Sequence, residues 1–180
     1  MKEIWARFTT ETNAADNLEK ALYFLGNVAQ HPEDWKWVII CCHSALYGFA
    51  VHVAKGSDDL SVIKETKKGN KRLISFGEAL KICKSSEGAR QALILTKDEE
   101  ESIHILQNEF RNKFEHFNPC AWSIEVSGFP NDIKNIINVI KRVAIDINFY
   151  NHIYGEDREK LLRVFDECLE KVNEISQQYA

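Results

Sequence analysis

The chain has 180 residues, of which 44% are apolar and 28% charged, an ordinary composition for a single globular domain over residues 1–180. The formal net charge of −4 argues against a general polyanion binder, because phosphate affinity comes largely from clustered lysine and arginine. Any contact with nucleic acid is therefore expected at a local patch.

Two features bear on the cellular compartment. Residues 1–13 carry charges throughout and contain no apolar stretch, so we expect no signal peptide. The five cysteines are an odd number, and Cys41 and Cys42 are adjacent. This pattern favours reduced thiols in a cytoplasmic protein over a disulfide framework.

Helical periodicity dominates the first third of the chain. Apolar residues at positions 18, 22, 25 and 28 predict a helix over residues 12–29. Pro32 then opens a second helix, and Lys55-Gly56 closes it. Residues 38–54 of this helix carry no formal charge. An uncharged run of this length, 17 residues, is at the lower limit for a transmembrane helix. A central helix buried in a bundle gives the same pattern, and we expect that rather than a membrane span.

The rest of the chain predicts four more helices. Residues 55–72 form a polar link, and Ser75 with Glu78 makes a capping box for a third helix ending near Lys84. Thr96 with Glu99 makes a second capping box for a fourth helix that ends at residue 117, before a proline. Residues 122–129 alternate as a short extended connector, and apolar stripes over 133–147 and 161–172 predict the last two helices. We therefore expect an all-α bundle of five to six helices with one extended connector.

The fourth helix has two distinct faces. At about 100° per residue, its apolar positions form one narrow stripe that faces the core; these are Ile103, Leu106, Phe110, Phe114 and Phe117. Asn112 lies nearly opposite that stripe, and His116 lies beside it one turn later. Ile105 is expected on this second face too, where an apolar residue suggests a cover, such as a second chain.

Arg111, Asn112 and His116 form a candidate reaction centre. The helix dipole favours the cationic form of a histidine in the last turn, and such an imidazole exchanges protons near neutral pH. An arginine can meet a phosphate with two hydrogen bonds and stabilise its charge, while Asn112 could orient the histidine or bind a substrate oxygen. Proton transfer with phosphate stabilisation is what RNA cleavage by its own 2′-hydroxyl requires, without a metal or other cofactor.

An ordinary surface helix end explains the same residues. Arg111 and Glu115 are four positions apart and could form a surface ion pair worth under about 1 kcal/mol. His116 could be a favourable C-terminal cation and nothing more. Three residues over six positions recur easily by chance, so the residues alone leave both interpretations open.

The motif Arg-Asn-x-x-x-His, here in "FRNKFEHF", resembles the signature of the HEPN superfamily. The strings "RNKFEHFNPCAWSIEVSGFP" and "CCHSALYGFAVHVAKGSD" are also similar to uncharacterised bacterial proteins of HEPN type, over roughly residues 35–130. The resemblance implies a helical bundle and, for many members, a homodimeric metal-independent endoribonuclease, often a toxin with an antitoxin partner protein. Other members keep the bundle but only bind a nucleotide or a partner protein. The motif would be catalytic through Arg111, Asn112 and His116, acting on RNA and not on DNA.

Two further groups are candidate binding residues. Lysines and arginines cluster around "KKGNKR", where a solvated Gly-Asn turn competes with an RNA-backbone contact; the candidate contacts are Lys67, Lys68, Lys71 and Arg72. Cys41, Cys42 and His43 suggest a metal, but consecutive helical residues point about 100° apart and cannot converge on one ion. We expect no metal site.

Overall fold

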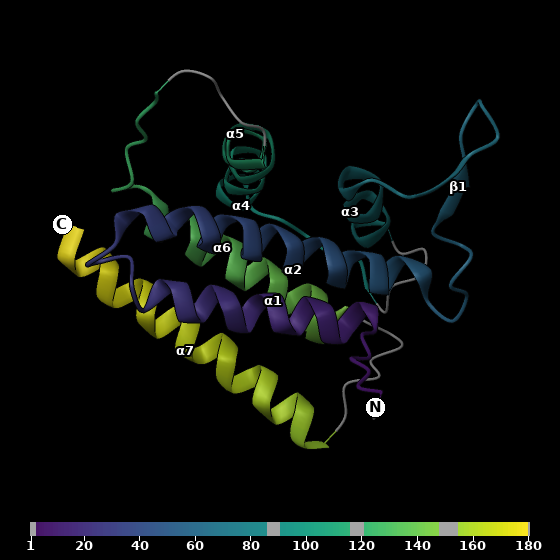
Figure 1. Ribbon diagram of the computed structural model, residues 1–180, viewed down its shortest axis with the longest axis horizontal. Helices are drawn as coiled ribbons and strands as arrows, with labels where there is room; N and C mark the ends of the chain where they lie inside the picture. Colours follow the sequence, from purple (N-terminus) through teal and green to yellow (C-terminus); the bar gives the residue numbers. More distant parts are fainter. Residues whose placement is uncertain (1–2, 86–90, 116–120, 148–154, 180) are drawn as a thin grey trace.

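The computed structural model describes residues 3–85, 91–115, 121–147 and 155–179. Within these ranges the fold is an all-α bundle with one small hairpin, as the sequence predicts for its class (Figure 1). The helices are α1 (Thr10–Leu25), α2 (Trp35–Lys55), α3 (Phe76–Lys84), α4 (Lys97–His104), α5 (Asn112–Glu115), α6 (Phe129–Lys141) and α7 (Gly155–Tyr179). Because α4 runs on into α5 through a π-helical segment, these seven ranges make six helical units.

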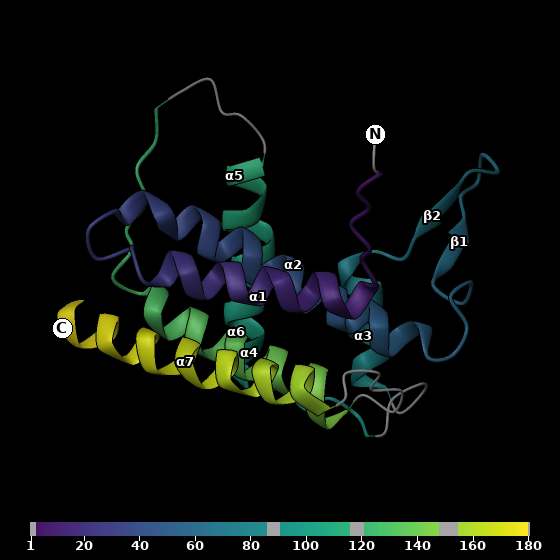
Figure 2. The same cartoon turned by 60° about the horizontal axis from the view of Figure 1, so that its bottom comes forward.

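Helices α1 and α2 run antiparallel and cross closely (Figures 1 and 2). The reason is the small side chains at the crossing: a Cβ atom placed on Gly48 would lie 2.8 Å from the Cβ of Ala14. Helix α1 begins at Thr10, two residues before the predicted start, and is capped by Thr9, whose side chain accepts from the backbone N–H of Thr12. It ends at Leu25, although Val28 beyond it is still buried.

Helix α2 is the central element. It begins after a short 3-10 turn at Pro32–Asp34 and ends at Lys55, followed by Gly56 with a positive φ of 53°, as the sequence predicts. Its length and apolar composition would suit a membrane span, but 67% of the apolar window is buried inside the bundle. The helix contacts α1, α3 and α6, so its apolar surface faces other helices. This is the burial expected of a central helix in a bundle.

The polar link contains structure that the sequence did not predict. Strands β1 (Ile63–Glu65) and β2 (Lys71–Leu73) pair antiparallel, with Ile63 opposite Leu73. The turn between them places Gly69 at φ 78°, a conformation that favours glycine. Each strand has only three residues and every one of them is exposed, so no buried alternation marks the hairpin in the sequence.

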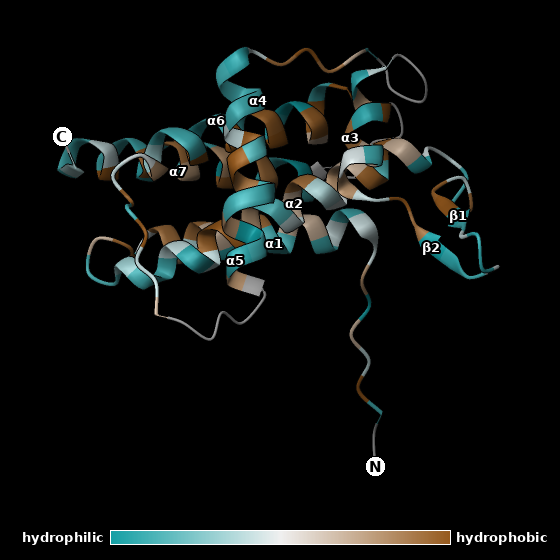
Figure 3. Ribbon diagram, turned by 90° about the horizontal axis from the view of Figure 1, so that it is seen from above, coloured by the Kyte–Doolittle hydropathy of each residue, from teal (hydrophilic) through white to brown (hydrophobic). Residues whose placement is uncertain are grey.

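The remaining helices follow their apolar stripes. The capping boxes at Ser75 and Thr96 form as predicted, with Glu78 and Glu99 closing them. The stripe of α6 and the π-helical segment Arg142–Asp146 that follows is buried throughout, at Ile133, Ile136, Ile137, Ile140, Val143 and Ile147. The buried apolar residues of the described chain form one core cluster, and Figure 3 shows the hydrophilic residues on the outward turns of α4 and α7.

Candidate functional site

The candidate motif follows an unusual helical turn. Helix α4 continues as a π-helical segment at Ile105–Arg111, and α5 begins with Asn112 (Figure 1). In a π-helix each N–H bonds the carbonyl five residues back, so one turn holds an extra residue. Residues after Ile105 are therefore rotated relative to a regular α-helix. Such turns occur frequently at functional sites.

The π-helical segment corrects the predicted position of Ile105. The sequence placed Ile105 on the exposed face beside Asn112, and its apolar character suggested a cover from a second chain. In the structure Ile105 is half-buried and lines a small crevice with Ile39 and Phe129, which belong to the core. Its apolar side chain is thus partly covered by its own chain, and Ile105 gives no support for a dimer interface.

Arg111 and Asn112 contact each other at the helix surface. Nη1 of Arg111 donates to Oδ1 of Asn112 at 3.4 Å, and Nδ2 of Asn112 donates to the backbone carbonyl of Asn108 at 3.5 Å. Arg111 is half-buried, whereas Asn112 is exposed as predicted. His116 lies outside the described residues, as does Phe117. The structure thus places two of the three motif residues, side by side at the end of the helix.

Aromatic packing fixes the body of this helix. The ring of Phe110 lies edge-on to Phe129 of α6, with centroids 4.7 Å apart, and Phe114 lies against Trp122 of the connector at 5.2 Å. Ile103 and Leu106 are buried and Phe110 packs on the core, as the predicted stripe requires. These contacts pack the core-facing side of the helix against the rest of the bundle. Arg111 and Asn112 therefore lie on a helix whose position is fixed by packing.

A partly buried polar network holds α4 against α6. The hydroxyl of Ser102 donates to Oδ1 of Asp132 at 2.8 Å and accepts from Nδ2 of Asn135 at 3.1 Å. Burial raises the pKa of Asp132, while its hydrogen bond from Ser102 acts in the opposite direction. This network lies immediately before the π-helical segment, and it anchors the turn that carries the motif.

The chain matches no protein-family model, no curated protein and no solved structure.

The basic cluster lies on the hairpin and is partly neutralised. Arg72 donates through both terminal nitrogens to the carboxylate of Glu78, at 2.8 and 3.1 Å, and Nζ of Lys64 donates to the same carboxylate at 3.0 Å. Lys67, Lys68 and Lys71 are exposed toward the hairpin turn. The hairpin leaves the opposite end of the bundle from the connector, so these lysines and the Arg111–Asn112 pair are not brought together (Figures 1 and 2).

The cysteines and histidines of α2 have structural surroundings. Cys41, Cys42, Cys83 and Cys168 are free and buried, and burial raises the pKa of Cys41 to about 11. His43 packs on the ring of Phe76 at 4.8 Å. Across the part of the chain that the structure describes, no three or more histidine, cysteine or acidic side chains are grouped to hold a metal.

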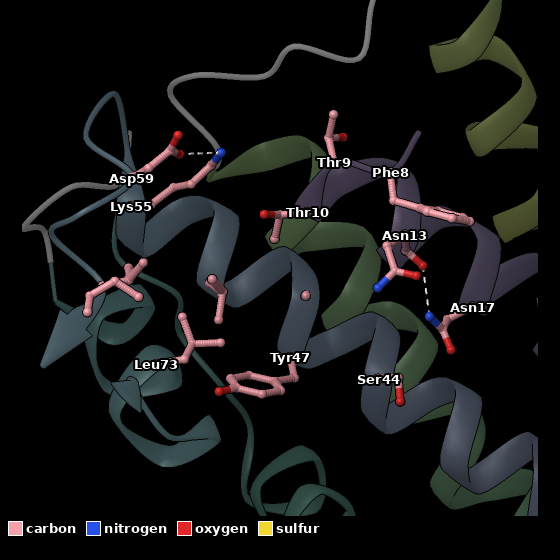
Figure 4. A pocket seen from close by; sticks show the side chains of 14 residues that line it. Phe8, Thr9, Thr10, Asn13, Asn17, Ser44, Tyr47, Lys55, Asp59 and Leu73 are labelled. Atoms are coloured by element: carbon pink, nitrogen blue, oxygen red, sulfur yellow. Dashed lines mark hydrogen bonds and ion pairs between the residues drawn. The ribbon is translucent and has the colours of Figure 1, made fainter. Parts of the chain in front are cut away.

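A groove beside α1 and α2 escaped sequence reasoning. It has a volume of about 790 Å³ and lies between the first turns of α1, the last turns of α2 and the hairpin (Figure 4). Polar groups reach it from α1 and α2, including Asn13, Ser44 and Tyr47, and apolar groups from the hairpin, including Ile63 and Leu73. Residue spacing along the chain does not reveal this groove, because it forms only when three elements meet.

Proposed function

We propose that the chain is a HEPN-like, metal-independent endoribonuclease that acts as a homodimer on cytoplasmic RNA. In this proposal Arg111 stabilises the phosphate, Asn112 orients the reacting groups and His116 transfers protons. A toxin or defence role with an antitoxin partner protein fits such an activity.

The observation that carries the proposal is the Arg111–Asn112 contact at the outer end of the π-helical turn. Asn112 accepts through a neutral amide, so this contact helps to orient the guanidinium and itself brings no opposing charge. An oriented guanidinium can meet two oxygens of one phosphate. Because Asn112 is exposed, the pair stands where a phosphate from solvent can approach it.

The reaction needs only groups of this kind. A base takes the proton of the 2′-hydroxyl, and the oxygen attacks the adjacent phosphorus as the bond from phosphorus to the 5′-oxygen breaks. An acid returns a proton to the departing 5′-oxygen. The products are a 2′,3′-cyclic phosphate and a free 5′-hydroxyl. Charge that gathers on the phosphate oxygens is stabilised by Arg111.

Dimerisation supplies the second proton-transfer group. One chain has a single histidine in the motif, whereas this cleavage works best with one group accepting a proton and another donating one. A two-fold dimer sets two copies of the same helix end around one cleft. Two arginines would also concentrate positive charge locally in a protein whose formal net charge is −4.

The direct test is incubation of purified protein with mixed RNAs in EDTA. We expect cleavage that survives chelation, leaves 2′,3′-cyclic phosphate or its opened form, and spares DNA. Arg111→Ala and His116→Ala should lower the rate by at least about 100-fold, the usual scale for a general acid–base or charge-stabilising group. Lys97→Ala, on the exposed first turn of α4, is the matched control and should cleave normally.

Two outcomes would overturn the proposal. Cleavage that disappears in EDTA and returns with a divalent cation would exclude the 2′-hydroxyl mechanism. Folded protein without any RNase activity would leave a non-catalytic bundle that binds a partner protein or a nucleotide.

A further inference from the structure

The segment before α1 exposes three large apolar side chains. Residues 3–8, here called the arm, precede the capping residue Thr9 and leave the bundle in an extended course (Figure 3). Ile4 is 94% exposed, Trp5 83% and Phe8 67%. The indole N–H of Trp5 donates to Glu3, inside the arm, at 3.2 Å. Apolar exposure this dense in six residues indicates a docking segment.

The groove beside the arm has an apolar wall of matching character. Ile63 and Leu73 stand directly opposite each other in the hairpin, so their side chains share one face, and both line the groove. They are 36% and 42% exposed, and Val51 and Val62 add apolar surface beside them. The groove volume of about 790 Å³ is large enough for several side chains.

The opposite wall of the groove suits a peptide backbone. The side chains of Asn13 and Ser44 face the groove from α1 and α2 (Figure 4). An amide and a hydroxyl each offer both a donor and an acceptor, which is what the N–H and C=O groups of an extended segment need. Backbone hydrogen bonds on one side and apolar contacts on the other are a common mode of binding an extended peptide.

The arm of the same chain is directed away from this groove. Thr9 is extended, with φ −110° and ψ 171°, and caps α1 by accepting from the N–H of Thr12, while its own N–H donates to the Thr12 hydroxyl. Phe8 therefore reaches the rim of the groove, but Ile4 and Trp5 are carried out into solvent. With this capping box formed, Phe8 of the arm lines the groove of its own chain, whereas Ile4 and Trp5 do not. A groove on a second molecule can take the arm with the cap intact.

We propose that two copies of this chain exchange arms, so that residues 3–8 of each copy occupy the groove between α1, α2 and the hairpin of the other. Reciprocal exchange closes a two-fold dimer with no unpaired arm. An aromatic side chain buries about 150–250 Å². Two arms with three apolar side chains each, together with the groove surfaces they cover, remove on the order of 1,000 Å² or more from water, which a specific interface requires.

The exchange does not depend on the proposed ribonuclease activity. The arm and α5 leave the body toward the same side of the molecule (Figures 2 and 3). Arm exchange therefore also allows the two motif ends to meet, which a ribonuclease dimer needs.

The test uses the full chain with single charges placed in the arm or in the groove. Trp5→Glu removes the arm contact, and Leu73→Glu removes the groove contact. Ile94→Glu is the matched control, because Ile94 is an exposed apolar residue (79%) outside the groove. By sedimentation equilibrium we expect each of the first two variants to raise the dimer dissociation constant at least tenfold, with Ile94→Glu unchanged. Circular dichroism checks that all three fold.

Mixing the two defective variants distinguishes exchange from every other dimer. The Trp5→Glu chain keeps an intact groove and the Leu73→Glu chain keeps an intact arm, so the mixture restores one arm–groove contact that neither variant has alone. We expect heterodimers in the mixture, detected by labelling one variant with ¹⁵N and cross-linking. If wild-type protein is monomeric, or the mixture gives no heterodimers, the exchange is wrong. A dimer that persists in both variants would also overturn it and would leave the ribonuclease proposal standing on a different interface.

Discussion

The Nδ1 atom of His52 on α2 lies 3.2 Å from Oε2 of Glu11 on α1. His52 is fully buried, and Glu11 is only 8% exposed. Because α1 and α2 run antiparallel, Glu11 sits in the first turn of one helix and His52 in the last turn of the other. The helix dipoles favour an anion and a cation at these two positions. The pair therefore joins the two helices at the end of the bundle where the groove begins.

Breaking this contact should destabilise the fold. Glu11→Ala leaves a buried nitrogen of His52 without its carboxylate partner, and we expect a loss of about 1–3 kcal/mol in the free energy of unfolding. Glu11→Gln retains an oxygen acceptor and should lose less than half of that amount. Urea denaturation followed by circular dichroism measures both. Equal losses in the two variants would show that the negative charge of Glu11, which neither variant retains, is what matters.

Replacement by alanine should have opposite effects on stability at Gly48, which lies at the close crossing of α1 and α2, and at Gly77 in α3. Gly48→Ala places a Cβ 2.8 Å from Ala14, so overpacking should cost about 1–3 kcal/mol. Gly77→Ala meets nothing within 4 Å in α3 and removes backbone entropy from the unfolded chain, so it should stabilise by about 0.4–1 kcal/mol. Thermal unfolding compares the two. A neutral Gly48→Ala would mean that the crossing relaxes freely.

Truncation of a core residue should lower the free energy of unfolding much more than truncation of a candidate site residue. Phe49 is fully buried, so Phe49→Ala should cost about 3–5 kcal/mol. Phe110 is half-buried, and its truncation should cost clearly less than that of Phe49 but more than 1 kcal/mol, through lost contact with Phe129. Asn112→Ala, at an exposed position, should change stability by less than about 0.5 kcal/mol. If Asn112→Ala were as damaging as Phe110→Ala, the residue would be part of the scaffold.

Glu78 makes the hairpin sensitive to strong acid only. Its pKa is held well below the usual range, first by the hydrogen bonds from Arg72 and then by the backbone N–H of Ser75 and by Lys64. A depressed folded-state pKa contributes stability above the unfolded pKa of about 4.3 and loses it as the pH falls through the folded value. The stability difference between wild type and Glu78→Gln should therefore be constant from neutral pH to about pH 5 and shrink below pH 4. A difference that already shrinks near pH 6 would contradict this assignment.

The hairpin lysines should contribute to RNA affinity through charge alone. Replacing Lys67, Lys68 and Lys71 together by alanine should weaken RNA binding at low salt and reduce the slope of log K against log salt by up to about 2, at about 0.7 for each phosphate contact to a single strand. A triple alanine variant at Lys97, Lys134 and Arg163, exposed on other helices, is the matched control. Fluorescence anisotropy at several salt concentrations measures the slopes. Equal slopes for the two triple variants would show that the hairpin lysines are solvated and do not contact the RNA backbone.

The sequence predicts those structural features that depend only on residues close together along one helix. The stripe from Ile133 to Ile147 and the capping boxes at Ser75 and Thr96 each need only local spacing, and the structure confirms them. The hairpin was missed because its strands have three exposed residues each, and the carboxylate that Arg72 and Lys64 contact belongs to Glu78 in the next helix. An alternation of apolar and polar residues over positions 63–73 could not reveal these contacts with Glu78.

The candidate site was only half predictable for a similar reason. The exposure of Asn112 follows from the apolar stripe, and the structure agrees. The predicted exposure of Ile105 was wrong, because Ile105 is half-buried at the first residue of a π-helical segment that leaves no mark in composition. The groove draws its walls from α1, α2 and the hairpin, so it exists only in the folded chain.

The π-helical turn before Arg111 has a consequence for the ancestry of this chain. A helix that accommodates one surplus residue between two packed stretches can gain or lose a single codon there without disturbing Ile103 on one side or Phe114 on the other. Evolution can therefore re-aim Arg111 and Asn112 by insertion or deletion as well as by substitution. Relatives without the surplus residue would align with this chain only across a one-position gap inside a continuous helix.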